Sequence, residues 1–376
     1  MTEKKETVSA SEKTGMSRRK FIYLVGAAGA TAVAAYAASS YLYPPQPPEE
    51  VPKELTMLFA GGSWQKYFHE VYGEGFEREN SIKIVYDTTA MGERIAKLNA
   101  YKEKQIFDLV HLSPAMAVQS RELGLLDDIS EDRVPNVKDV NPAFKIEKYF
   151  VPKVVTIWGI AYNTKVLKEP PKSWWSLWDS AYKGKIFIPA FGWTGEAWLH
   201  LINKLLGGNE ENLDPGIKKI AQLVKDNKAL VADSADQALA FFRRGEVVVA
   251  GHWDGRTREL MKEGLTLDFV YPEEGVVNFS YGTGLVKGRP KSSTRLTEKL
   301  INLQLDPAKQ AQFVQKVEYS PTNLKAMALL PAAAQHLKIT DEQMKILNKV
   351  TLDYFKMAKV RDYALDRWNK EVLGKA

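Results

Sequence analysis

The chain of 376 residues contains no cysteine. This absence excludes disulfide bonds, thiolate zinc sites, iron–sulfur clusters, thiol nucleophiles and anchoring through a lipid-modified cysteine. Histidine is also scarce. The five histidines form neither an HExxH pattern nor a close pair. The sequence therefore gives no sign of a metal centre, and we expect neither a metal nor a cofactor.

A second feature that the chain lacks is a polybasic tract outside its first residues. The formal net charge is +6, but residues 1–20 hold six lysines and arginines against three glutamates, so +3 of the +6 lies there and +3 on the remainder. This distribution argues against nucleic acid as a partner. The 45% hydrophobic content is enough for two or three domains with their own cores.

The start of the chain has the pattern of an export signal. Arg18 and Arg19 precede an apolar run at residues 21–43 that is rich in alanine and glycine. A paired arginine in this position is typical of the twin-arginine route, which exports folded proteins, whereas an ordinary anchor helix is the alternative. Ala35–Ala37 is a candidate cleavage site, but the run is also long enough to span a bilayer. We predict an extracytoplasmic protein and leave cleavage open.

Four prolines between residues 44 and 48 follow the apolar run. Such a segment is stiff and extended, so it would separate the membrane from the folded part if the anchor is kept. Residues 1–54 are therefore assigned to a signal or anchor followed by a proline-rich linker.

The stretch from Tyr149 to Pro189 organises the rest of the chain. Residues 154–158 and 160–162 have β character, two prolines at 170 and 171 interrupt them, and a return strand is expected at 185–189. We interpret this stretch as a crossover between two α/β lobes.

Before the crossover, the chain repeats a β-turn-α unit. Strands are expected at 55–60, 82–86 and 107–112, each followed by a helix, which predicts a parallel sheet with helices on both faces. Ser63 and Ser113 are predicted helix caps, and Pro114 supports the second start. Because ligands of such sheets lie beyond the carboxyl ends of the strands, these turns are candidates for binding.

After the crossover, further strands and helices are predicted. Glu196 lies in the first turn of a helix that follows an irregular AFGWTG segment, and a buried strand at 246–250 ends in Gly251–Gly255. The segment 278–286 is the expected route back to the first lobe. Asp306 and Pro307 start one later helix, and Thr340 with Gln343 caps a long final helix that carries Met344, Leu347, Val350 and Tyr354.

Several motifs together resemble a known family. The WGIAYNT run at 158–164, the tryptophan-rich segment 173–186, HWDG at 252–255, PEEG at 272–275 and YSPTN at 319–323 resemble extracellular solute-binding proteins of ABC importers, in the spermidine/putrescine-binding branch. The resemblance implies an α/β, two-lobed periplasmic binding protein-like fold with two hinge crossings and parallel-rich sheets flanked by helices. It also implies a small-molecule ligand held between the lobes and delivered to an ABC permease with its ATPase.

The resemblance and the crossover together set the expected boundaries. Lobe 1 is predicted at residues 55–156 and 282–325, lobe 2 at 157–281, and a helical segment that packs on the lobes at 326–376.

The resemblance also points to binding residues. Ser113, Glu196 and Trp253 match cleft positions of the polyamine binders, but Tyr281 stands where those proteins have an aspartate, and the AFGW segment replaces another carboxylate. An extended polyamine is therefore less favoured than a zwitterionic amine, an amino-acid–sugar conjugate or a heterocyclic cation, although core packing is the alternative for each tryptophan. The predicted ligand-binding residues are Ser63, Trp64, Thr89, Ser113, Trp193, Glu196, Trp253, Asp254 and Tyr281.

Two other functions stay open from the sequence. One is a twin-arginine-exported enzyme, but Gly282-Thr283-Gly284 lacks the third glycine of a dinucleotide loop and no GxSxG motif is present. His252, beside Trp253 and Asp254, has the position of a metal ligand or general base, but a strand-end histidine is more often a hydrogen-bonded structural residue, and we interpret it so. The other is a surface sensor domain that passes its ligand signal to a receptor, which the sequence does not distinguish from an importer component. We predict a protein that is not an enzyme.

Overall fold

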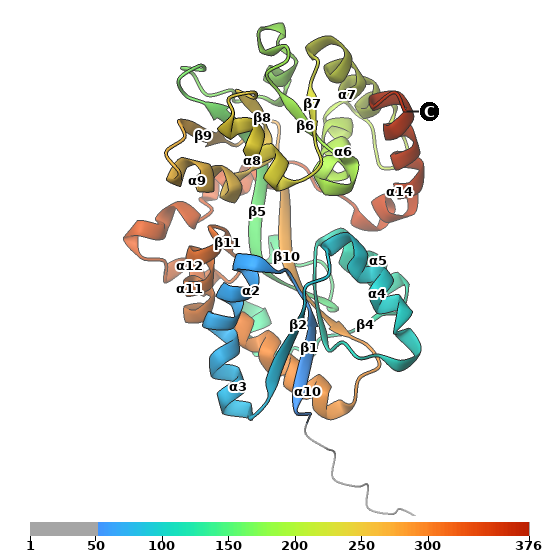
Figure 1. Ribbon diagram of the computed structural model, residues 1–376, viewed down its shortest axis with the longest axis vertical. Coiled ribbons are helices and arrows are strands. Elements are labelled where there is room, and N and C mark those ends of the chain that lie inside the picture. The colour runs from blue at the N-terminus through green and yellow to red at the C-terminus, as the bar shows by residue number, and fades with distance from the viewer. Residues whose placement is uncertain (1–51, 376) are drawn as a thin grey trace, which may run out of the picture. The chain divides into compact units, whose positions relative to one another are not determined.

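The computed structural model describes residues 52–375, so the predicted signal, anchor and most of the linker lie outside the described residues. Its strands are β1 (Glu54–Leu58), β2 (Lys83–Asp87), β3 (Leu109–Leu112), β4 (Leu126–Asp127), β5 (Phe150–Asn163), β6 (Phe187–Pro189), β7 (Leu230–Ala232), β8 (Val249–Trp253), β9 (Leu267–Val270), β10 (Val277–Val286) and β11 (Ser320–Pro321). Figure 1 shows how they are arranged.

The α-helices are distributed around these strands. They are α2 (Gly62–Phe68), α3 (Glu74–Asn80), α4 (Arg94–Ala100), α5 (Pro114–Glu122), α6 (Glu196–Leu205), α7 (Asp214–Asn227), α8 (Ala235–Arg243), α9 (Asp254–Lys262), α10 (Lys291–Gln304), α11 (Pro307–Val317), α12 (Leu324–Ala328), α13 (Asp341–Leu347) and α14 (Tyr354–Arg367). Short π-helical turns also occur, including η8 (Phe191–Gly195) before α6 and η10 (Trp368–Val372) after α14.

Two long antiparallel strands, β5 and β10, connect two groups of strands. The first part of β5 pairs with β10, and its last residues pair with β8 and β9. β10 continues to β3, which leads to the parallel strands β1 and β2. In Figure 1, β5 and β10 run vertically, with β6–β9 above and β1–β4 below. The three parallel β-turn-α units expected before the crossover are present.

β5 is one strand of fourteen residues, whereas the sequence suggested two strands separated at Gly159. A Cβ at Gly159 would lie 2.6 Å from the carbonyl oxygen of Val270 and 2.7 Å from the ring of Phe269. The glycine therefore lets β9 approach β5 closely and does not end the strand.

The apolar core is divided in the same way as the sheet. One cluster includes Trp158, Trp174, Trp198 and residues of β6 and β8, together with Trp368 and Val372 from η10. A second cluster combines β1, α2 and α3 with residues of α10 and α11. Each cluster thus draws on segments that are far apart in the sequence.

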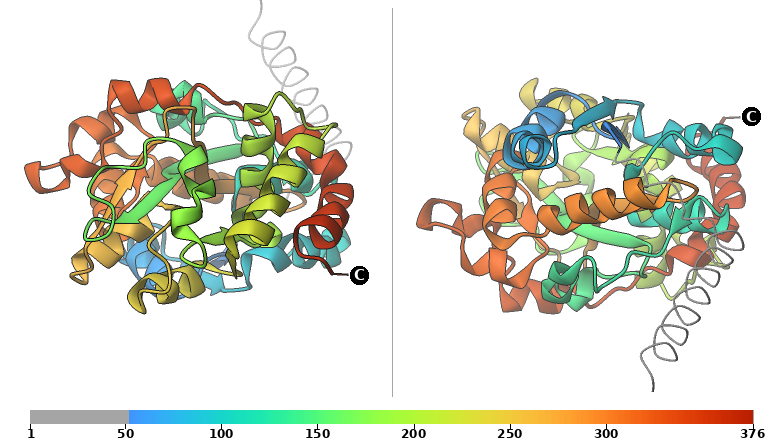
Figure 2. Two further views of the ribbon diagram at one scale, coloured as in Figure 1. Left: turned by 90° about the horizontal axis from the view of Figure 1, so that it is seen from above. Right: turned by 90° about the horizontal axis from the view of Figure 1, so that it is seen from below.

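The last part of the chain contains a break that the sequence did not reveal. Thr340 and Gln343 form the predicted capping box, but helix α13 ends at Leu347. A new helix, α14, starts after Asp353, whose side chain accepts hydrogen bonds from the amides of Phe355 and Lys356. The prediction of one long final helix is therefore wrong. α14 packs against α5 and α6, and Figure 2 (left) shows it in red beside the yellow-green helices.

Within residues 52–375, no helix is both long enough and apolar enough to cross a bilayer.

Candidate functional site

A cavity of about 540 Å³ lies where α4, α5, η8, α6, β10 and α14 meet. It is bounded on one side by elements that precede β5 and on the other by elements that follow it. Its lining residues are Met91, Gly92, Ile95, Ala96, Asn99, Ser113, Ala115, Met116, Gln119, Leu123, Phe191, Gly192, Trp193, Thr194, Glu196, Ala197, Phe279, Tyr281, Tyr354, Met357, Ala358 and Arg361.

Ser113 lies at the N-cap position of α5, at the end of β3. Pro114 occupies the first helical position, as predicted, but the side chain of Ser113 forms no capping hydrogen bond. Its hydroxyl is therefore not used to hold the helix, although the residue is buried and lines the cavity. A hydroxyl in this position can donate to or accept from a bound molecule.

Glu196 is the acidic residue of the cavity. It starts α6, where the helix dipole favours a carboxylate, and its side chain is 15% exposed. Its Oε2 atom lies 3.3 Å from the Nε atom of Arg361 on α14. Burial raises the pKa of Glu196 to about 7, while Arg361 opposes this rise. The carboxyl group therefore changes its charge near neutral pH.

Aromatic side chains form much of the remaining wall. Trp193 packs edge-on against Trp158, with ring centroids 5.5 Å apart, and Tyr281 stacks on Tyr319 at 6.3 Å. Burial raises the pKa of Tyr281, so its hydroxyl stays neutral. The aromatic residues that line the cavity are Phe191, Trp193, Phe279, Tyr281 and Tyr354. Such faces suit apolar ligand surfaces and cationic groups.

Of the nine predicted site residues, the structure brings Ser113, Trp193, Glu196 and Tyr281 together in this cavity. Three others, Ser63 and Trp64 on α2 and Thr89 after β2, do not line it, although the ring of Trp64 lies 6.3 Å from that of Tyr281. Ser63 does not cap α2, because the helix begins one residue earlier, at Gly62, with Gly61 as its N-cap. Trp64 packs between His111, Phe313 and Tyr319.

Thr89 is occupied by hydrogen bonds within the protein. Its hydroxyl donates to Asp87 over 2.5 Å and accepts from Lys97 over 2.9 Å. Its carbonyl accepts from Arg94, which also donates to the carbonyls of Phe59 and His111. This network fixes the end of β2 against α4, and Thr89 does not line the cavity.

Trp253 and Asp254, at the end of β8, are part of the interior. Trp253 is 3% exposed and lies between Trp158 and Phe279, at centroid distances of 4.9 and 4.8 Å. Asp254 is 1% exposed, accepts from the hydroxyl of Thr156 and pairs with Arg258. In this structure neither side chain has surface left for a ligand, because the HWDG turn is covered by its own neighbours.

Several cavity residues were not predicted from the sequence. The most notable are Tyr354, Met357, Ala358 and Arg361, which all come from α14. They are spaced three, four and seven residues from Tyr354, which places them on one face of a helix. This spacing is the signal in the sequence that could have grouped them. The periodicity does not say which partner that face covers, so the contact with the cavity could not be inferred.

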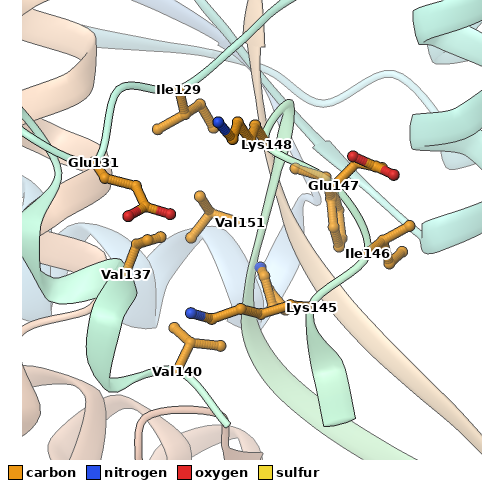
Figure 3. Close-up of a pocket in the computed structure, with 11 residues that line it drawn as sticks. Ile129, Glu131, Val137, Val140, Lys145, Ile146, Glu147, Lys148 and Val151 are labelled. Carbon is orange, nitrogen blue, oxygen red and sulfur yellow. The ribbon is translucent and has the colours of Figure 1, made fainter. Parts of the chain in front are cut away.

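A second cavity, of about 230 Å³, lies in the segment that leads into β5 (Figure 3). Ile129, Val137, Val140 and Val151 form an apolar wall, and charged side chains stand around it. None of the nine predicted site residues lines this cavity. It lacks the convergence of aromatic and buried ionisable groups that marks a binding site, so we favour the larger cavity.

Among residues 52–375, no group of three or more histidine, aspartate or glutamate side chains is arranged to hold a metal ion. His252 is buried, and its Nδ1 atom lies 3.1 Å from the hydroxyl of Thr257, within the core. Burial lowers the pKa of His252 to about 3, so this imidazole is neutral.

Known proteins resemble this chain over most of its length. It is 26% identical over 279 residues to the spermidine/putrescine-binding periplasmic protein 1 of Haemophilus influenzae, covering 72% of this chain and 76% of that protein. It is 24% identical over 298 residues to the gamma-aminobutyric acid-binding protein of Pseudomonas aeruginosa, covering 75% and 81%.

A solved structure shows the same fold. The spermidine/putrescine ABC transporter substrate-binding protein of Streptococcus pneumoniae superposes with a TM-score of 0.67 at 21% sequence identity, covering 84% of this chain and 98% of that one. The predicted α/β, two-lobed periplasmic binding protein-like fold is confirmed by this match. In addition, a model of the bacterial extracellular solute-binding proteins matches residues 72–340. The chain is therefore a member of the bacterial extracellular solute-binding protein family.

Proposed function

We propose that the protein is the solute-binding component of an ABC importer and captures a small amine-containing or zwitterionic ligand in the cavity beside Glu196. The observation that carries the proposal is this cavity, which has walls from both sides of the crossover, aromatic faces, and one acidic and one basic side chain. Relatives are named for binding spermidine and putrescine or gamma-aminobutyric acid, which all contain an amine.

The charges of the cavity favour a ligand with little net charge. Among the residues that line it, Glu196 is the carboxylate and Arg361 the cation, and the two already form a pair. A polyamine brings at least two ammonium groups, and an ammonium group that loses its water without gaining a carboxylate is strongly unfavourable. A monoamine or a zwitterion can be matched by this pair, whereas an extended polyamine cannot.

The proposed mechanism is closure of two lobes around the ligand. We keep the boundaries inferred from the sequence, with lobe 1 at 55–156 and 282–325 and lobe 2 at 157–281, connected through β5 and β10. Contacts of the ligand with both walls would offset the cost of closure, so the closed form is selected through its higher affinity. The closed form would then be recognised by a membrane permease that works with an ATPase.

The proposed location is outside the cytoplasmic membrane. The arginine pair at residues 18–19 supports export by the twin-arginine route, and the apolar run that follows it would keep the protein at the membrane if it is not cleaved. A sensor that passes its ligand signal to a receptor would use the same cavity. Binding experiments with purified permease and receptor candidates from neighbouring genes separate the two roles.

The first test is to identify what the native protein carries. Native mass spectrometry of the protein purified from its own source, followed by a thermal-shift panel of amines, zwitterions and sugars, should give a small amine-containing molecule. Trp193→Ala is expected to weaken its binding, and Trp175→Ala, which alters a tryptophan outside the cavity, should not. A protein that carries no small molecule and is stabilised by none of the panel would contradict the proposal.

A further inference from the structure

α14 and the residues just before and after it pack into the apolar cluster that contains Trp158. Leu352, Met357, Ala364 and Trp368 are all buried in the cluster that contains Trp158. The amide of Asp353 donates to Glu210 over 3.1 Å, and Lys204 donates to the carbonyl of Thr351 over 2.7 Å. α14 is therefore a fixed part of this half of the molecule.

Arg361 lies in the middle of α14, and its side chain is partly exposed. Its guanidinium carbon lies 5.7 Å from the ring centroid of Phe191, which is itself buried and packs on Trp368. Its Nε atom lies 3.3 Å from the Oε2 atom of Glu196, and 40% of its side chain is exposed. The guanidinium group is thus held in position by Phe191 and Glu196 while part of it still reaches water.

The pair between Arg361 and Glu196 is loose on the arginine side, because its Nε–Oε2 distance is 3.3 Å and the side chain of Arg361 is 40% exposed. The side chain of Glu196 is 15% exposed, so its carboxylate needs another cation when Arg361 leaves it. By contrast, a planar guanidinium group binds an oxyanion through two parallel hydrogen bonds, which are stronger than bonds between neutral groups. An anionic group of a ligand can therefore compete for Arg361, while an ammonium group of the same ligand takes its place beside Glu196.

We infer that Arg361 binds the anionic end of the ligand, which makes α14 part of the binding site and Arg361 the residue that selects zwitterions over polyamines. This inference rests on the proposed function. The anionic end is a carboxylate or another oxyanion such as a phosphonate, since both present oxygens to the guanidinium fork. The family model ends at residue 340, before α14, so the match with the family does not supply this residue.

The test compares ligands that differ at one end. Gamma-aminobutyric acid and putrescine are both four-carbon amines, but one ends in a carboxylate and the other in a second ammonium group. 2-Aminoethylphosphonate tests the other kind of oxyanion. Isothermal titration with the full chain should show tighter binding of an oxyanion-bearing probe than of putrescine.

Arg361→Gln should weaken the binding of the oxyanion-bearing probe by about tenfold or more, because a charge-assisted bidentate contact is lost. It should narrow or reverse the preference over putrescine, because Glu196 loses its competing partner. Lys359→Gln is the matched control, since it removes the same charge from an exposed position of α14 that does not line the cavity. Arg361→Lys should restore part of the affinity, and thermal unfolding checks that each variant folds.

Different results separate this inference from the function on which it rests. If the wild type binds a probe or carries a small molecule, but Arg361→Gln and Lys359→Gln change the affinity equally, the assignment of Arg361 is overturned while the function stands. If the wild type binds putrescine more tightly than the oxyanion-bearing probes, the assignment of Arg361 is also overturned while the function stands. If the wild type binds no probe and carries no small molecule, the function itself fails and the inference fails with it.

Discussion

The pKa of Glu196 leads to a quantitative prediction for ligand binding. A pKa of about 7 means that roughly one molecule in ten has an ionised Glu196 at about pH 6 and roughly nine in ten at about pH 8. A bound ammonium group favours the ionised form, so the protein must release a proton before it binds an amine at low pH. The apparent affinity for an amine is therefore expected to fall about tenfold from pH 8 to pH 6.

The same shift has a defined effect on stability without ligand. The pKa is raised above the ordinary value of 4.5 by burial, and Asp362 adds to the rise while Arg361 opposes it. The folded state therefore holds the proton more tightly than the unfolded state, and the free energy of unfolding falls as the pH rises from 4.5 to about 7. Ligand binding should recover this loss, because the ammonium group compensates the buried charge.

The assay is isothermal titration with gamma-aminobutyric acid at several pH values, in two buffers with different heats of ionisation. The difference between the buffers reports the number of protons released, which should approach one near pH 6 and zero near pH 8. Glu196→Gln should bind more weakly and with little dependence on pH in this range. If Glu196→Gln keeps the slope of the wild type, another group titrates and our account of Glu196 is incorrect.

Three further predictions concern single side chains. Ser113→Ala should weaken ligand binding, measured by titration calorimetry, by about 0.5 to 1.5 kcal/mol. The melting temperature should not change, because the Ser113 hydroxyl does not cap α5, and a large drop would show a structural role. Asp254→Ala should reduce the free energy of unfolding, measured with urea, by about 3 kcal/mol or more, because it leaves Arg258 and the Thr156 hydroxyl without their buried partner. Normal stability together with lost ligand binding would instead make Asp254 a ligand contact. Gly159→Ala should cost about 1 to 3 kcal/mol in the same urea experiment because its methyl group meets the backbone of Val270, whereas Gly192→Ala, with open space around it, is the control and should cost less.

Local signals in the sequence were sufficient for many elements. Asp306 with Pro307 and Thr340 with Gln343 start helices as predicted, because a cap is a contact between residues a few positions apart. The strand ends that carry Ser113 and the helix start that carries Glu196 were also found in this way. These two residues then lie in the same cavity although β3 and β6 belong to different sheets, because the cavity takes its walls from both sides of the crossover.

Long-range packing is what the sequence could not supply. Trp193 follows the end of β6 and Trp253 is the last residue of β8, and both have glycines beside them, yet only Trp193 reaches the cavity, because Trp158 and Phe279 cover Trp253. Likewise, Gly159 suggests the end of a strand from the sequence alone, whereas in the structure β5 continues through it and β9 packs against it. The place of α14 depends on contacts with helices more than a hundred residues earlier, which no local pattern encodes.

The division of the core has a consequence for how the protein is made. The cluster around Trp158 is completed by Trp368 and Val372, and the cluster around β1 is completed by residues as late as Leu337. Neither half can bury its apolar surface while these late residues are still inside the ribosome. Stable folding must then wait until nearly all of the chain has been synthesised, which leaves a period in which a chaperone has exposed apolar surface to hold.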